Sequence, residues 1–242
     1  MGLTIHYTLS VKADISLGVV RELVKRAAQY ARKIGCAQVG ELLRAEQEEN
    51  HEPLFFPIGK RKTRGGLREQ LCGAAVPTRG WLVHVWPGAG CETATFGLCQ
   101  YPRRISYDRH YVSTGFKGGW RFQSFCKTQY AGKHGWEHFS KCHRQVVSLL
   151  DFWRGLGVRV KVNDEGHYWK TRSLEELRAE LGDYDRLIAA VGGVFKDVCD
   201  GAGAGLSVES PVFDYKDFER LEHEGRMEYG GRIQQLMGKL NR

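Results

Sequence analysis

Several signals that would fix a chemistry or a location are missing from this sequence. Its seven cysteines include no Cys-x-x-Cys pair, and an odd number in a long chain favours reduced thiols over a disulfide framework. No apolar run approaches the ~18 residues that a membrane-spanning helix needs, and the first residues alternate polar and apolar instead of resembling a signal peptide. No internal repeat is present. These absences predict a cytoplasmic protein without a membrane partner.

What is present is an ordinary globular composition with a surplus of basic residues. Of 242 residues, 42% are hydrophobic and 26% are charged, and the net charge is +8. A chain of this length buries roughly 70–75% of its unfolded surface, so we expect a real hydrophobic core. The net positive charge favours a polyanionic partner, because Lys and Arg raise the local concentration of phosphates. The alternative is a soluble protein whose surface is simply basic.

Hydrophobic periodicity predicts an α+β fold. Residues 3–11 alternate as a half-buried strand, and an amphipathic helix follows, with Asp14 or Ser16 as its N-cap and Gly35 as its end. The remaining core elements are a helix over about 137–153 and strands at 81–86, 93–99, 120–127 and 158–162. This order resembles a split βαβ (ferredoxin-like) arrangement, with helices on one face of a mostly antiparallel sheet and a helical C-terminal region beyond it.

We expect one α+β domain over residues 1–200, interrupted by an irregular insert at about 36–80. Within the insert, the basic stretch Gly59–Gly66 predicts a flexible loop, and it lacks the G-x-x-x-x-G-K-[ST] order of a phosphate-binding P-loop. Residues 201–242 are predicted to form a glycine-rich linker and a helical tail.

Glycine also guides the prediction of the C-terminal helices. A short helix is expected from Ser173 to Leu181 and a second one after Asp183, and the tail is expected to be helical only in pieces, with breaks at Gly225 and Gly230.

Outward residues of three predicted strands define a basic sheet surface. The candidate ligand-binding residues on it are Arg121, Phe125, Lys127, Arg159 and Lys161. Cations with an exposed aromatic ring suit phosphate neutralisation and base stacking, so our first hypothesis is a protein that binds nucleic acid or another phosphate-rich ligand. The interleaved basic and aromatic residues of 101–111 suit the same role or any exposed loop. The alternative is that the insert or the tail covers this face.

A second hypothesis is a metal-dependent phosphodiesterase or nuclease-like enzyme. Asp164, Glu165 and His167 fall just past a predicted strand end, where two carboxylates could hold Mg²⁺ while Lys127 or His143 stabilises or moves charge on a phosphate. Adjacent strand residues point in opposite directions, so the turn would have to reorient one carboxylate. The alternative is a solvated turn.

Two weaker arrangements involve cysteine. His134, His138 and Cys142 are spaced four apart, which can bind zinc if one helix carries all three; the alternative is a buried thiol beside two ordinary histidines. Cys126 with His143 would pair a thiol and an imidazole as a nucleophile requires, but the strand pattern predicts that Cys126 lies in the core.

Three blocks of the central third resemble the recurring blocks of a family of uncharacterised bacterial proteins. They are residues 124–131 (SFCKTQYA), 139–143 (FSKCH) and 162–169 (VNDEGHYW). The resemblance implies that these blocks belong together, and the family has no assigned activity, cofactor or catalytic residue to carry over. A third hypothesis, independent of the resemblance, is a structural or interaction protein that forms homo-oligomers through its helical tail.

Overall fold

The computed structural model describes residues 3–11, 14–45, 54–62, 68–107, 110–116, 118–202 and 209–240. The strands are β1 Thr4–Val11, β2 Gln38–Val39, β3 Leu43–Ala45, β4 Leu54–Lys62, β5 Arg68–Ala75, β6 Arg79–Trp86, β7 Ala94–Gln100, β8 Arg104–Tyr107, β9 His110–Ser113, β10 Trp120–Lys127 and β11 Arg159–Asp164. The helices are α1 Leu17–Lys33, α2 Trp136–Gly155, α3 Tyr168–Thr171, α4 Leu174–Ala202 and α5 Phe218–Leu240, with short 3₁₀ helices η1 Gln129–His134 and η2 Pro211–Asp214.

Seven strands form one antiparallel sheet in the order β11-β1-β10-β7-β6-β2, and β3 pairs with β6 beside β2. The strands β11, β1, β10 and β7, with α1 after β1 and α2 between β10 and β11, have the order of a split βαβ fold. The strands β6, β2 and β3 extend it on one side. The predicted α+β class, with a mostly antiparallel sheet and helices packed on it, is confirmed.

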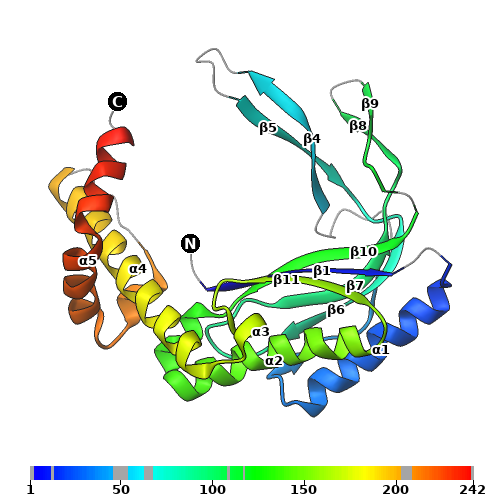
Figure 1. Ribbon diagram of the computed structural model, residues 1–242, viewed down its shortest axis with the longest axis horizontal. Coiled ribbons are helices and arrows are strands. Elements are labelled where there is room, and N and C mark those ends of the chain that lie inside the picture. The colour runs from blue at the N-terminus through cyan, green and yellow to red at the C-terminus, as the bar shows by residue number, and fades with distance from the viewer. Residues whose placement is uncertain are drawn as a thin grey trace.

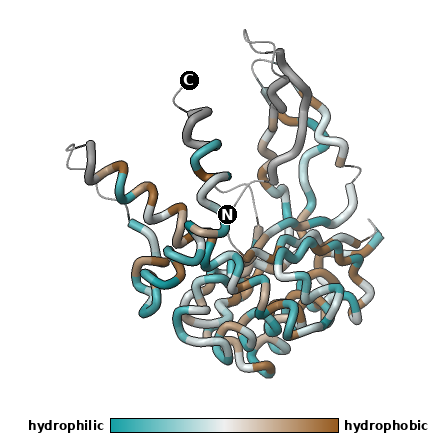
Figure 2. Tube along the Cα trace, turned by 60° about the vertical axis from the view of Figure 1, so that its left-hand side comes forward, coloured by the Kyte–Doolittle hydropathy of each residue, from teal (hydrophilic) through white to brown (hydrophobic). Residues whose placement is uncertain are grey.

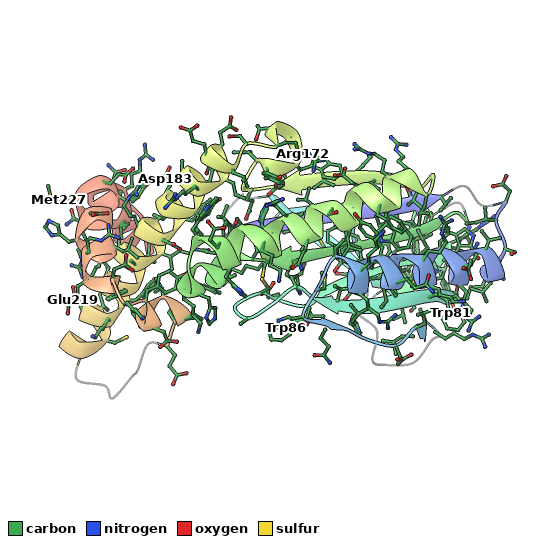
Figure 3. All side chains as sticks on the ribbon, turned by 90° about the horizontal axis from the view of Figure 1, so that it is seen from below. Trp81, Trp86, Arg172, Asp183, Glu219 and Met227 are labelled. Carbon is green, nitrogen blue, oxygen red and sulfur yellow. The ribbon has the colours of Figure 1, made fainter. Side chains whose placement is uncertain are left out.

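Helices α1 and α2 cover one face of the sheet, as Figure 1 and the view from below in Figure 3 show. The Ser16 side chain caps α1 by accepting a hydrogen bond of 3.3 Å from the backbone N–H of Val19. The apolar stripes of both helices meet the inward residues of β1, β7 and β10, and Trp120 and Trp153 are fully buried between the layers. The core therefore fixes which strand residues must point away from the helices.

Three local predictions based on glycine were wrong. Helix α4 runs unbroken through Gly182, and α5 runs unbroken through Gly225 and Gly230, because the two helices pack along each other and tertiary contact outweighs helix propensity. Helix α4 continues through Gly201 to Ala202, where the linker was predicted to begin, while residues 203–208 lie outside the described ranges.

The insert predicted to be irregular at about 36–80 contains strands β2 to β5. Gly59–Lys62, predicted as a loop, belong to β4, which pairs with β5 in an antiparallel hairpin; residues 63–67 are not among those described. β4 and β5 are stabilised by the hydrogen bonds that they make with each other. Polar and apolar alternation along one strand does not reveal such a pairing, so these strands were not predicted.

Two hairpins, β4–β5 and β8–β9, project from one end of the sheet, and the helices α4 and α5 rise at the opposite end (Figure 1). Figure 2, turned by 60°, shows the same separation. Both groups stand on the side of the sheet opposite α1 and α2. Among the described helices, none combines the length and apolar character that a membrane span requires.

Candidate functional site

The sheet face that α1 and α2 leave uncovered carries a regular grid of polar side chains from β11, β1 and β10. Ser10 of β1 lies between Arg121 and Arg159, and the next row places Thr8 between Gln123 and Lys161. The grid is dictated by the core, because the alternate residues of β1 and β10 are buried against the helices. All four long side chains of these two rows are exposed.

A third row adds an aromatic pair. His6 lies opposite Phe125 on one side and Asn163 on the other, and the His6 and Phe125 ring centroids are 5.8 Å apart. The Phe125 side chain is 46% exposed although β10 is an interior strand of the sheet, with β1 on one side and β7 on the other. An aromatic ring in this position offers a flat apolar face that no described side chain covers fully.

The cations of this face lack carboxylate partners. Among the described residues, Arg121, Lys127, Arg159 and Lys161 form no ion pair. The arginines of α4 and α5 differ sharply, since Arg186, Arg220 and Arg226 each contact two acidic side chains. The tail therefore neutralises its own positive charge, and the open sheet face does not.

The two ends of the face have different surroundings. At the hairpin end, the Arg121 guanidinium lies 6.0 Å from the centroid of the Phe116 ring. At the helical end, the Lys127 Nζ lies 4.8 Å from the centroid of the Tyr130 ring, and the Lys127 backbone N–H donates to the Glu92 carboxylate over 3.3 Å. Cation–π contacts hold both cations near the face while leaving their charge unpaired.

The hairpin β8–β9 presents further basic and aromatic side chains beside the face. Tyr111 is 80% exposed, and Arg103, Arg104 and His110 are exposed with it. A surface cavity of about 440 Å³ at the base of this hairpin is lined by Arg103, Arg104 and Phe116, together with Ser113 and Gly115. The basic and aromatic pattern of 101–111 thus lies on a projecting hairpin, close to where β10 begins.

Of the residues predicted for an enzyme, the structure brings His143 and Asp164 together. Both are buried; His143 Nε2 lies 3.3 Å from Asp164 Oδ1, and His143 Nδ1 lies 2.9 Å from Thr128 Oγ1. The backbone N–H groups of Gly166 and Trp169 also donate to the Asp164 carboxylate, over 2.9 and 2.7 Å. Burial raises the pKa of Asp164, but the bonds from His143 and these two N–H groups outweigh it and leave the pKa below its usual value. This carboxylate already has protein donors on both oxygens.

The other three predicted catalytic residues point elsewhere. Glu165 accepts a hydrogen bond of 2.9 Å from the Thr4 backbone N–H, His167 is exposed with Nε2 3.7 Å from Glu180, and Lys127 lies over Tyr130. Within the described ranges, no three His, Cys, Asp or Glu side chains converge closely enough to hold a metal ion. The phosphodiesterase hypothesis thus stays a prediction from sequence.

The two thiols of the weaker hypotheses, Cys126 and Cys142, are buried. Cys126 is fully buried, as its place in the strand pattern predicted, and its Sγ lies 3.2 Å from the Glu92 carbonyl oxygen, to which it donates. A hydrogen bond with Cys91 and the nearby His138 lower the pKa of Cys142 to about 7, against the effect of burial. His138 Nε2 is 2.9 Å from the Ala89 carbonyl oxygen, so this imidazole is used inside the fold.

Sequence reasoning missed two residues that matter here. Thr128 completes the buried contact with His143, and no pattern marks it, because it follows the last residue of β10. Tyr111 was part of the interleaved segment, but its high exposure follows from the hairpin and not from its neighbours in sequence.

Comparisons with protein-family models, with curated proteins and with solved structures find no match for this chain. What the protein can bind is therefore inferred from its own geometry.

Proposed function

We propose that this protein binds single-stranded nucleic acid across the open face of its sheet. The observation that carries the proposal is a set of four unpaired cations, Arg121, Lys127, Arg159 and Lys161, placed around the exposed ring of Phe125. Single-stranded nucleic acid combines the two features that this face would complement, a chain of phosphates and bases with free π-faces.

The size of the face supports an extended ligand. The row of Ser10 lies six positions along β1 from that of Thr4, which corresponds to about 20 Å at ~3.4 Å per residue. Arg121 and Arg159 stand at one end of this length and Lys127 at the other, with Lys161 between them. A backbone that follows the face would meet a cation along its whole path.

Phe125 and His6 favour a single strand over a duplex. Bases in a duplex are already stacked and paired, whereas splayed bases can stack on an aromatic side chain. Such stacking is worth about 1–3 kcal/mol per base. The Phe125 ring, in the middle of the cations, would stack one base while the cations neutralise the flanking phosphates.

The proposal is tested with the full chain and a fluorescein-labelled single strand of 20 nucleotides, in RNA and DNA forms, by fluorescence anisotropy. We expect the logarithm of the affinity to fall linearly with the logarithm of the salt concentration, by about 0.7 for each phosphate contacted. Binding that does not weaken with salt, or no binding at low salt, would contradict the proposal.

Variants separate this face from general basicity. Arg121→Gln, Arg159→Gln and Lys161→Gln should each weaken binding and reduce the salt slope, whereas Arg220→Gln removes an exposed charge that is paired within α5 and should leave both unchanged. Phe125→Ala should weaken binding by about 1–3 kcal/mol, or roughly 5- to 150-fold in Kd. Its matched control is Phe195→Ala in α4, since that ring is 43% exposed.

A further inference from the structure

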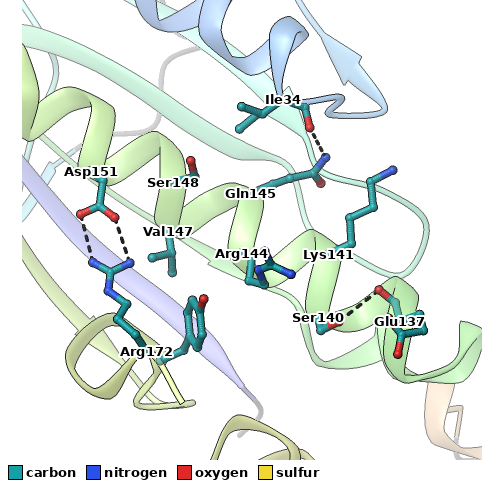
Figure 4. A pocket seen from close by; sticks show the side chains of 11 residues that line it. Ile34, Glu137, Ser140, Lys141, Arg144, Gln145, Val147, Ser148, Asp151 and Arg172 are labelled. Atoms are coloured by element: carbon teal, nitrogen blue, oxygen red, sulfur yellow. Dashed lines mark hydrogen bonds and ion pairs between the residues drawn. The ribbon is translucent and has the colours of Figure 1, made fainter. Parts of the chain in front are cut away.

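A cavity of about 460 Å³ lies on the helical side of the molecule, away from the open sheet face (Figure 4). It follows one side of α2, between Ile34 at the end of α1 and the residues of α3 and its C-cap, Tyr168 and Arg172. Its size is within the range of small-molecule sites. Because α1 and α2 separate it from the sheet, it is independent of the function proposed above.

Two of the cations that line the cavity have no ion-pair partner among the described residues. Lys141 and Arg144 are exposed on α2, one helical turn apart, and neither forms an ion pair with any described residue. Residues three apart on a helix project to the same side, so both charges can reach one anion. A phosphate group is the anion that two such donors bind well, since charge-assisted hydrogen bonds are short and strong.

The far end of the cavity is closed by an ordered cluster. The Arg172 guanidinium binds both carboxylate oxygens of Asp151 over 2.9 and 3.0 Å, and Arg154 contacts the same carboxylate over 2.8 Å. Both arginines also contact Trp169, with their Cζ atoms 4.9 and 5.1 Å from its ring centroid. One carboxylate shared by two guanidinium groups leaves a net positive charge at this end too.

The cavity wall contains one buried amide oxygen, Gln145 Oε1, that lacks a hydrogen-bond donor among the described residues. Gln145 Nε2 donates to the Ile34 carbonyl oxygen over 3.0 Å, while its Oε1 is buried and has no hydrogen-bond partner among the described residues. An unpaired buried acceptor is unfavourable. Lys141 stands one turn before Gln145 and points the same way in Figure 4, so both side chains line the same part of the cavity.

We infer that this cavity binds a small phosphate monoester that also carries hydroxyl groups. Lys141 and Arg144 would bind its phosphate, and Gln145 Oε1 would accept a hydrogen bond from a hydroxyl group. Inorganic phosphate would bind only to the two cations, and an uncharged sugar would form a hydrogen bond only with the Gln145 amide. The cavity therefore distinguishes the ester from either of its parts.

Isothermal titration calorimetry of the full chain with ribose 5-phosphate, inorganic phosphate and ribose tests this site. We expect ribose 5-phosphate to bind at least tenfold more tightly than inorganic phosphate, and ribose to give no measurable heat. Absence of binding by the ester overturns the site, and equal affinity for inorganic phosphate overturns the assignment of an ester.

Three variants assign the roles. Lys141→Gln and Arg144→Gln should each weaken ribose 5-phosphate binding by tenfold or more, and Arg26→Gln, on the exposed side of α1, should not change it. Gln145→Met keeps the length of the side chain but removes the acceptor, so it should reduce the difference in affinity between ribose 5-phosphate and inorganic phosphate. Circular dichroism checks that each variant is folded. If both cation variants bind like wild type while folded, the proposed site is wrong.

Discussion

His143 is a buried polar residue whose two ring nitrogens connect α2 to Thr128, which follows β10, and to Asp164 of β11. The helical pattern places His143 at the margin of the apolar stripe of α2, yet the side chain is fully buried. Its burial depends on Thr128 and Asp164, which bind its two ring nitrogens and come from elements far apart in the chain. Periodicity records the neighbours along one helix and contains no information about such partners.

Asp185 is a second buried polar residue, and its environment raises its pKa. The carboxylate accepts hydrogen bonds from Gln129 Nε2 over 3.2 Å and from the Tyr215 hydroxyl over 3.4 Å. Burial nevertheless dominates and raises the pKa from 3.8 to about 6. Between these two pH values the folded protein holds a proton that the unfolded chain has released, so its stability falls as the pH rises and the full loss is present above about pH 6.

We therefore expect Asp185→Asn to stabilise the protein at pH 8 by about 1–3 kcal/mol and to change little at pH 4. The asparagine oxygen can still accept from Gln129 and Tyr215, but it carries no charge to bury. Urea denaturation at both pH values measures the difference, and Asp14→Asn, at an exposed position, is the control for a lost charge. A stabilisation of equal size at pH 4 and pH 8 would show that ionisation is not its cause.

Among the elements, α4 and α5 show how packing reverses the meaning of glycine. A Cβ atom at Gly225 would collide with the backbone carbonyl of Arg186 in α4 and would lie 3.0 Å from the Ala190 Cβ. This glycine lets two helices approach closely. Gly230, five residues later in the same helix, has no atom within 4 Å of the position of a Cβ. The sequence presents the two glycines alike, and only the partner helix distinguishes them.

Alanine at these two positions should have opposite effects. Gly230→Ala gains helix propensity and should raise the free energy of unfolding by up to about 1 kcal/mol. Gly225→Ala makes the same local gain, but it forces α4 and α5 apart and should lower stability by about 1–2 kcal/mol. Urea denaturation followed by circular dichroism at 222 nm measures both. If the two variants shifted in the same direction, close approach at Gly225 would not be what holds the helices together.

The sheet, by contrast, could be predicted well. The strands β1, β6, β7, β10 and β11 were located to within a few residues. Alternation identifies β1, β10 and β11, because in each of them residues of higher and lower exposure alternate, whereas β7 is almost wholly buried and was predicted with β6 from the glycine-rich turn between them. The same alternation identified Arg121, Phe125, Arg159 and Lys161 as outward residues, and all four are exposed. Whether they bind a ligand remains a prediction. The helical C-terminal region was predicted as well, but the β4–β5 hairpin and the unbroken course of α4 and α5 were missed, because these elements are stabilised by partner segments and not by a layered core.

For the molecule as a whole, the open face and the β8–β9 hairpin are separate surfaces, so the length of a bound strand can show whether it contacts one of them or both. Phe125 lies in β10 on the open face, and Tyr111 lies in β9 of the projecting hairpin (Figure 1). We expect a strand of four nucleotides placed on Phe125 to stay on the sheet face and a strand of twenty to reach the hairpin as well.

We expect Phe125→Ala to weaken the binding of both lengths and Tyr111→Ala to weaken only the longer one, by about 1–3 kcal/mol. The two losses should add in the double variant, because the sites share no contact. Fluorescence anisotropy with four- and twenty-nucleotide strands measures this. A Tyr111→Ala effect on the short strand would place the ligand on the hairpin instead of the sheet.

The helical tail bears on the third hypothesis, an oligomeric structural protein. Three of its arginines, Arg186, Arg220 and Arg226, form ion pairs with acidic side chains of α4 and α5, and Met227 is 79% exposed on α5. These features leave oligomer formation as a prediction for light scattering.

Each projecting hairpin begins and ends at strands that are paired with each other. The chain leaves the sheet after β3 and returns in β6, which pairs with β3, and it leaves again after β7 and returns in β10, which pairs with β7. Each hairpin segment therefore starts and ends at neighbouring positions of the sheet. Its length does not affect how the core strands are paired. Insertions or deletions in these hairpins would therefore change how far the hairpins project from the sheet while leaving the register of the layered body intact.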